Sequence, residues 1–298
     1  MVQKHSWSFE ATGTWWTIDV WNVQEERLRE IEQGIARKVQ SFENTFSRFK
    51  PDSLVSRLKG QVGEFEVGED FIDLLKLYMC FFDITAGKFT PLIGSQLEEA
   101  GYDQNYSFAG RVRHNVPDLI AVTDIVDNKT VRVYCPVSFD FGAVGKGFLI
   151  DLLSGCLVSC SLGGFCVEAG GDMFFYRNND KSENSAPPYL KVGLEHPACH
   201  DRVIGSVFLA PNTAICGSSG NRRMWGKYHH ILNPHKLRSS RLILASWVVS
   251  SYAALADAAA TALFLAEPEI LRGMEGVEYC VVDSNGIRTS GNNVFHVI

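Results

Sequence analysis

The sequence has little cysteine, and no two of its cysteines form a Cys-x-x-Cys pair. The 8 cysteines among 298 residues are too sparse and too scattered for a disulfide scaffold. Most lie in apolar runs such as Glu278 to Val282, which is typical of reduced, buried thiols in an intracellular protein. The missing pair also disfavours a zinc site, for which His196, Cys199 and His200 remain the candidate ligands.

An excess of positive charge is absent too. The chain has 28 Lys and Arg against 34 Asp and Glu, so its formal net charge is −6. Because a nucleic-acid-binding protein needs a basic face for the phosphates, this balance argues against a nucleic-acid partner. Hydrophobic residues make up 46% of the chain and aromatic residues 11%, which excludes an intrinsically disordered protein.

The amino-terminal residues contain no apolar segment typical of a signal peptide and no cysteine for lipid attachment. We therefore expect a cytoplasmic location. The longest apolar stretch, residues 245–266, carries Asp257 near its middle. A carboxylate at the centre of a membrane span costs ~2.5–3.5 kcal/mol. The stretch is therefore predicted to be a strand followed by a helix, with no membrane span.

Apolar residues recur at helical spacing in some segments and at strand spacing in others. Helices are predicted over residues 24–46, 54–58 with Ser53 as cap, 68–86, from the glycine-rich segment 140–147 to about 160, and 251–266. Strands are predicted over residues 14–21, 119–123, 130–134, 165–168, 173–176, 189–194, 203–209, 242–249, 277–282 and 294–298. Helices and strands do not alternate strictly, which favours an α+β fold. We expect one compact unit over residues 1–298, with mixed or antiparallel sheets and packed helices, and two lobes as the alternative arrangement.

Two glycine-rich segments are candidate anion sites. In residues 140–147, glycines stand at a helix start next to Lys146, where backbone N–H groups can face an anion. The spacing is not that of a phosphate-binding P-loop, and an ordinary strand-to-helix turn is the favoured interpretation of this segment alone. Residues 168–172 place Gly170 and Gly171 before Asp172, between two apolar runs. This segment has two possible interpretations, a hairpin turn and a functional loop.

Three further features carry oxygen or nitrogen ligands. Asp257 and Thr261 are four residues apart among alanines, so on a helix they share one face that suits a hard cation such as Mg²⁺. A helix-terminal aspartate is the alternative. His230 precedes Asn-Pro and could act as a base, although a strand-end histidine is favoured for a lone residue. Residues 216–223 are predicted to form a polar glycine loop beside two arginines, suited to phosphate.

In their order along the chain, these segments resemble the motifs of the ApbE family of FAD:protein FMN transferases. The matching segments are Thr12 to Thr14, Ser47 to Leu58, Phe89 to Gly94, Asp140 to Asp151, Ala169 to Asp172, His230 to Pro234 and Ala256 to Leu263. The resemblance implies an enzyme that binds FAD with Mg²⁺, transfers FMN to a Thr or Ser hydroxyl of a flavoprotein and releases AMP. The acceptor protein is not identified by the sequence.

Site residues follow from the same resemblance. It implies that Asp257 and Thr261 bind Mg²⁺ together with the backbone carbonyls of Ala143 and Ala260, and that His230 deprotonates the acceptor hydroxyl. It implies an FAD site formed by Thr12, Phe49, Gly101, Tyr102, Asp140, Lys146, Gly170, Gly171, Asp172 and Ile231.

The chain departs from the family motifs at several positions. Thr12 replaces a Met, Phe49 a Tyr and Thr90 an Asp, and Arg222 lies near the position of a missing Tyr. Asn233 replaces the Asp that follows the family histidine, and if that Asp tunes the histidine, the base is weaker here. An FAD pyrophosphatase and a non-catalytic FAD-binding protein are therefore the alternative functions.

Overall fold

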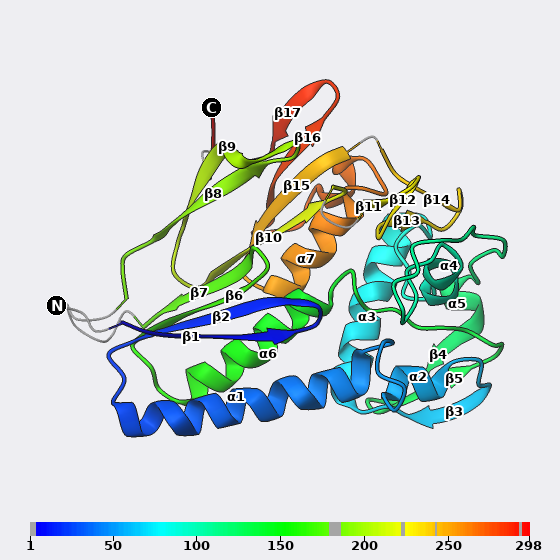
Figure 1. The fold of residues 1–298 in the computed structure, drawn as a ribbon, viewed down its shortest axis with the longest axis horizontal. Helices are drawn as coiled ribbons and strands as arrows, with labels where there is room; N and C mark the ends of the chain where they lie inside the picture. Colours follow the sequence, from blue (N-terminus) through cyan, green and yellow to red (C-terminus); the bar gives the residue numbers. More distant parts are fainter. Residues whose placement is uncertain (1–3, 179–185, 222–223, 242, 292–293) are drawn as a thin grey trace.

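The computed structural model describes residues 4–178, 186–221, 224–241, 243–291 and 294–298. Its centre is an eight-stranded antiparallel sheet in the order β1-β2-β6-β7-β10-β15-β16-β17 (Figure 1). The strands are β1 Lys4–Ala11, β2 Thr14–Trp21, β6 Gly164–Ala169, β7 Asp172–Arg177, β10 Thr213–Ser219, β15 Ile243–Ser250, β16 Glu278–Asp283 and β17 Gly286–Thr289. This antiparallel sheet with packed helices confirms the predicted α+β class.

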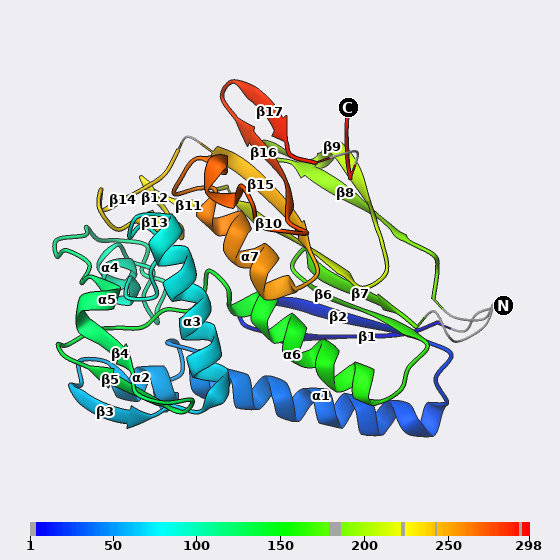
Figure 2. The same cartoon turned by 180° about the vertical axis from the view of Figure 1, so that it is seen from behind.

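Helices cover one face of this sheet. They are α1 Glu25–Phe46, α6 Gly145–Ser159 and α7 Ala253–Ala262, with α3 Glu69–Ile84 at one end (Figure 2). The six apolar residues that recur along α1 are all buried, as its periodicity predicts: Leu28, Ile31, Ile35, Val39, Phe42 and Phe46. They pack in one large core with α6, α7 and the inward side chains of the sheet.

A three-stranded sheet packs on the opposite face. It consists of β8 Leu190–His196, β9 Cys199–Leu209 and β18 Phe295–Val297. Successive residues of a strand point to opposite faces, so in β6 Phe165 and Val167 join the helical core while Cys166 joins the core under β8 and β9.

A smaller group of elements lies beyond α3 (Figure 2). It contains the sheet β3 Gly63–Glu66, β5 Thr130–Val133 and β4 Thr123–Ile125, and the short helices α2 Leu54–Leu58, α4 Gly94–Glu99 and α5 Leu119–Val122. Two small hairpins adjoin it, β11 Met224–Trp225 with β12 Tyr228–His229 and β13 Leu232–Asn233 with β14 Arg238–Ser239. The 3-10 helix Pro268–Leu271 follows α7. The expectation of a single unit over residues 1–298 stays a prediction.

Several predicted elements differ from the structure. Residues 119–122 form a helix and not a strand, because Asp118 caps it by accepting a hydrogen bond from the N–H of Ala121 (3.0 Å). Residues 213–219 form the central strand β10, so the predicted polar loop begins only after it. The edge strand β1 was not predicted. Leu242, Arg222 and Arg223 lie outside the described residues. Within the described residues, no helix is long and apolar enough to cross a membrane.

Candidate functional site

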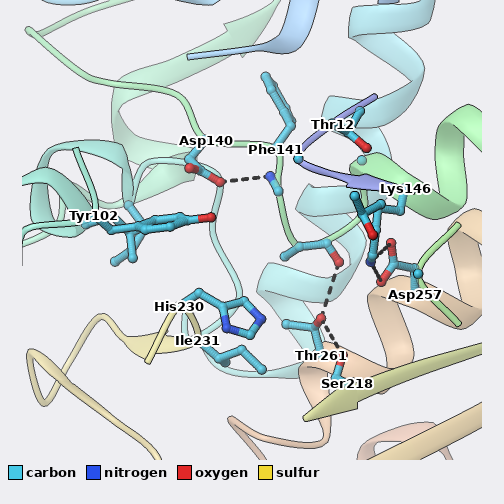
Figure 3. A pocket seen from close by; sticks show the side chains of 18 of the residues that line it. Thr12, Tyr102, Asp140, Phe141, Lys146, Ser218, His230, Ile231, Asp257 and Thr261 are labelled. Atoms are coloured by element: carbon cyan, nitrogen blue, oxygen red, sulfur yellow. Dashed lines mark hydrogen bonds and ion pairs between the residues drawn. The ribbon is translucent and has the colours of Figure 1, made fainter. Parts of the chain in front are cut away.

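A cavity of about 840 Å³ lies between one end of the large sheet and the smaller group of elements. Its lining comes from segments that are far apart in the sequence, from Thr12 to Leu265. Figure 3 shows Tyr102 and Asp140 on one side and Lys146, Asp257 and Thr261 on the other, with His230 between them. The fold therefore brings most of the predicted site residues together around one space.

Lys146, in the first turn of α6, lies between two buried carboxylates. Its Nζ is 2.6 Å from Asp172 Oδ2 and 3.3 Å from Asp257 Oδ1, and both aspartate side chains are only 2% exposed. Burial lowers the pKa of Lys146, but the two aspartates outweigh it and raise the pKa above its usual range. Burial raises the pKa of Asp257, Lys146 opposes this rise, and Asp172 adds to it. With both carboxylates ionised, the three groups carry one net negative charge.

Backbone N–H groups fix both carboxylates. The N–H of Gly147 donates to Asp257 Oδ2 (2.9 Å), and the N–H of Gly217 donates to Asp172 Oδ1 (2.8 Å). Gly147 is required where α6 crosses α7, because a Cβ there would lie 2.3 Å from the carbonyl oxygen of Ala253. The carboxylates are therefore held in place before any ligand binds.

The turn before Asp172 is a hairpin that also lines the cavity. Ala169 pairs with Asp172, and the two residues between them, Gly170 and Gly171, have φ of 59° and 101°. Positive φ at the two glycines confirms the hairpin interpretation. The same turn forms part of the cavity lining, and a functional role of the loop stays a prediction.

Three kinds of oxygen converge beside Lys146. Asp257 and Thr261 lie one turn apart on α7, and the Thr261 hydroxyl donates to the carbonyl of Ala143 (3.3 Å) and lies 3.1 Å from the hydroxyl of Ser218. A carboxylate, hydroxyls and a backbone carbonyl are the ligands of hard cations such as Mg²⁺. These residues fit a divalent cation. Ser218 was not singled out from the sequence.

Ala260 does not join this group of oxygens. It lies outside the cavity lining, and its carbonyl accepts a hydrogen bond from the Ser246 hydroxyl of β15 (2.7 Å). Near the end of α7, the N–H of Phe264 donates to the carbonyl of Thr261 and not to that of Ala260. The Ala260 carbonyl is therefore available to the Ser246 hydroxyl. In this structure the carbonyl implied as a cation ligand is thus engaged elsewhere.

The predicted zinc ligands are not seen to form a metal site within the described residues. The part of the chain that the structure describes contains no group of three or more His, Cys, Asp or Glu side chains placed to hold a metal. The side chain of His200 lies outside that part. All eight cysteines are free, as their sparse distribution predicts. Only Cys166, Cys216 and Cys280 are buried, so the prediction of mostly buried thiols is wrong.

The other side of the cavity is aromatic and centred on Arg48. The Arg48 Nε forms an ion pair with Asp140 Oδ2, and its Nη2 donates to the backbone carbonyl of Tyr102 (2.7 Å). The guanidinium lies 4.2 Å from the ring centroid of Phe49 and 5.0 Å from that of Tyr102. Asp140 is therefore already paired, since its Oδ1 also accepts from the N–H of Gly142 (2.8 Å). Arg48 was missed in the sequence, where it is an unassigned position inside the Ser47 to Leu58 motif.

Gly101 supports this side without lining the cavity. Its φ is +96°, and a Cβ there would lie 2.4 Å from the backbone nitrogen of Ala109. Gly101 closes the turn that presents Tyr102. The rings of Tyr102 and Trp225 stack with their centroids 5.5 Å apart.

His230 is presented by a segment that its neighbour His229 holds. The buried His229 bonds through Nε2 to the carbonyl of Ser240, and its Nδ1 accepts from the N–H of Ile231 (3.2 Å). With one nitrogen donating and the other accepting, the ring is neutral. Burial lowers the pKa of His229, the Ser240 carbonyl opposes this, and Arg241 adds to the lowering. These two hydrogen bonds of His229, here called the neutral clamp, fix the backbone on both sides of His230.

Asn233 has a structural use. Its Oδ1 accepts hydrogen bonds from the N–H groups of His235 and Lys236, both at 3.0 Å. An aspartate could accept the same two bonds, so the turn explains why either residue fits this position.

The predicted residues divide clearly by position. Those that line the cavity are Thr12, Phe49, Tyr102, Asp140, Ala143, Lys146, Gly170, Gly171, His230, Ile231, Asp257 and Thr261. Gly101, Asp172 and Ala260 lie behind the lining, and of these Asp172 acts on it through Lys146.

The sequence is similar to known proteins of one family. The profile of the ApbE family matches residues 12–281. A protein from Rhodobacter capsulatus named FAD:protein FMN transferase is 24% identical over 277 residues, which is 88% of this chain and 51% of that protein. One from Treponema pallidum (strain Nichols) with the same name is 26% identical over 225 residues, 66% of this chain and 60% of that protein. The chain thus spans about half to three fifths of the length of these relatives.

Solved structures match over nearly the whole chain. The ApbE protein from Thermotoga maritima has a TM-score of 0.83 at 25% identity and covers 97% of each chain. The flavin transferase ApbE from Vibrio cholerae has a TM-score of 0.78 at 17% identity, with coverage of 99% of this chain and 98% of that one. The second likeness establishes the fold alone.

Proposed function

Because the chain belongs to the ApbE family, we propose that it transfers FMN from FAD to a Thr or Ser hydroxyl of a flavoprotein, with Mg²⁺, and releases AMP. The observation that carries the proposal is the position of Asp257, Thr261 and the Ala143 carbonyl beside Lys146 in one cavity. The names of the two curated relatives support the same activity.

The charges around Lys146 are the reason why the proposal includes a bound cation. The two aspartates already offset the positive charge of Lys146, so this group supplies no further cation to balance the diphosphate of FAD. A bound Mg²⁺ would supply positive charge that stabilises the phosphoryl oxygens during transfer. Asp257, Thr261 and the Ala143 carbonyl are the residues that would hold it.

Each remaining residue then has a role that its position supports. Lys146 would bind a phosphoryl oxygen while the two aspartates keep it protonated. His230, directed into the cavity in Figure 3, would accept the proton of the attacking hydroxyl. The aromatic side with Phe49 and Tyr102 would pack against a ring of FAD and exclude water.

The products of an incubation with FAD and Mg²⁺ distinguish this function from its alternatives. Chromatography that finds AMP together with flavin bound to an added host protein fraction supports transfer. AMP with free FMN identifies an FAD pyrophosphatase, and FAD that binds without turnover identifies a flavin-binding protein. The acceptor and the cytoplasmic location stay predictions, and fractionation of host cells tests the second.

A further inference from the structure

Arg48 is a buried cation with an unused donor. Its side chain is 5% exposed and lines the cavity. Nε pairs with Asp140 and Nη2 with the Tyr102 carbonyl, whereas Nη1 is buried and has no hydrogen-bond partner among the described residues. A buried N–H without a partner costs about 1–3 kcal/mol, which makes a ligand atom the natural acceptor.

The charge of Arg48 is already balanced. The Asp140 carboxylate contacts the guanidinium directly, so the pair as a whole is neutral. A paired guanidinium attracts a phosphate less strongly than an unpaired one, and its remaining N–H can donate equally to an uncharged acceptor. The free N–H therefore suits a neutral acceptor, such as a carbonyl oxygen or a ring nitrogen.

The surroundings of Arg48 favour a flat ring. Its guanidinium lies over Phe49, which stacks on Tyr106 with centroids 5.3 Å apart and planes 12° apart. Tyr106 and Phe108 both have φ of 48°, a strained backbone that holds the two exposed aromatic side chains at the cavity. A planar heterocycle can pack on these rings and accept a hydrogen bond at its edge.

We propose that Arg48 is the residue that recognises one heteroaromatic ring of FAD, by donating a hydrogen bond from Nη1 to an acceptor on the edge of that ring. Asp140 then acts through Arg48, whose guanidinium it orients and neutralises. This proposal rests on the proposed function, because it assumes that FAD occupies the cavity. The flavin and the adenine both carry suitable acceptors, and the experiment separates them.

The test compares two halves of FAD that carry the same phosphate group. Affinities for FMN and for AMP are measured by titration with Mg²⁺ for the wild type, Arg48→Met and Arg48→Lys. Arg48→Lys keeps a cation beside Asp140 but lacks the guanidinium fork. Arg57→Met is the control, since Arg57 is exposed in the same segment of the chain.

The proposal predicts that both Arg48 variants lose roughly 10- to 100-fold in affinity for one of the two nucleotides and less than threefold for the other. The nucleotide whose affinity falls identifies the ring that Arg48 contacts. Equal losses for FMN and AMP would assign Arg48 to the phosphate, and unchanged affinities would leave it a structural residue, so either result overturns the proposal. If Arg48→Met does not fold, as judged by circular dichroism, the FMN and AMP affinities of Arg48→Lys alone test the proposal. A wild type that binds neither nucleotide overturns the proposed function itself.

Discussion

At the scale of single residues, the groups around Lys146 determine how strongly the cavity binds an anion. The lysine holds two carboxylates that are 2% exposed, and a diphosphate would have to approach all three groups together. Removing the lysine would leave two buried carboxylates without a cation, which is costly for stability and removes the positive charge available to an anion.

Lys146→Ala is therefore expected to weaken FAD binding at least tenfold and to lower the free energy of unfolding by about 3 kcal/mol. The matched control is Lys191→Ala, because Lys191 lies in β8 outside the cavity lining, with its ammonium 5.8 Å from the ring centroid of Phe208. Flavin-fluorescence titration measures both affinities. Equal FAD affinities of the two variants would show that Lys146 pairs with the two aspartates without binding FAD.

His230→Ala is expected to reduce FMN transfer by roughly 10²- to 10⁴-fold, the usual contribution of a positioned base, while FAD affinity stays within threefold. Asn233→Asp keeps both turn hydrogen bonds, so it should fold normally and raise transfer severalfold if added negative charge supports the histidine. Flavin bound to protein after denaturing electrophoresis measures transfer. Parental transfer in His230→Ala would rule out this base.

His229 predicts a specific dependence of stability on pH. Its pKa is lowered in the folded protein, so below about pH 6.5 the unfolded chain takes up a proton that the folded ring resists. The stabilisation by His229 is fully present above that pH and is lost as the pH falls. The difference in unfolding free energy between wild type and His229→Gln should therefore shrink as the pH falls from 6.5 to 5.5. Urea unfolding at both values measures it, and a constant difference would contradict the neutral clamp.

At the scale of elements, the contact between α6 and α7 positions Lys146 against Asp257. Asp151 of α6 accepts from the first N–H groups of α7, those of Ala253 and Ala254, at 2.9 and 2.8 Å. Burial raises the pKa of Asp151 to about 6, and these two N–H groups oppose the rise. One helix thus caps the other, and Gly147 allows the close approach on which the cap depends.

Gly147→Ala should lower the free energy of unfolding by about 1–3 kcal/mol, because its Cβ would overlap the Ala253 carbonyl and Asp257 Cβ. Gly155→Ala on the same helix meets nothing within 4 Å and should be neutral or stabilising by about 0.5–1 kcal/mol. Thermal unfolding of both variants tests the pair. A Gly147→Ala protein as stable as Gly155→Ala would contradict the packing of the two helices.

Elements with a strong local pattern could be predicted from the sequence. Six apolar residues at helical spacing define α1, and Ser53 caps α2 by accepting from the N–H of Ser56, as expected. The strand β10 was missed because its Gly217, Ser218 and Ser219 have the composition of a loop, and only pairing with β7 and β15 makes them a strand.

At the scale of the whole molecule, the cavity depends on contacts between distant segments. The motifs correctly predict that Asp257 and Thr261 share a helix face, and both residues line the cavity. They do not predict Arg48, whose partners come from residues 102 and 140, nor the Ala260 carbonyl, whose direction depends on β15. Pairings between residues far apart in the sequence are absent from any local pattern.

The proposed transfer reaction is tested most directly by in-gel flavin fluorescence of host lysate incubated with the purified protein, FAD and Mg²⁺. Wild type and Lys191→Ala should label a protein with flavin that survives denaturing electrophoresis, and labelling should require both FAD and Mg²⁺. Asp257→Ala should fold and give no label, since it removes the anionic ligand of the cation. The absence of any labelled protein with wild type, or labelling by Asp257→Ala with unchanged dependence on Mg²⁺, would contradict the proposed function.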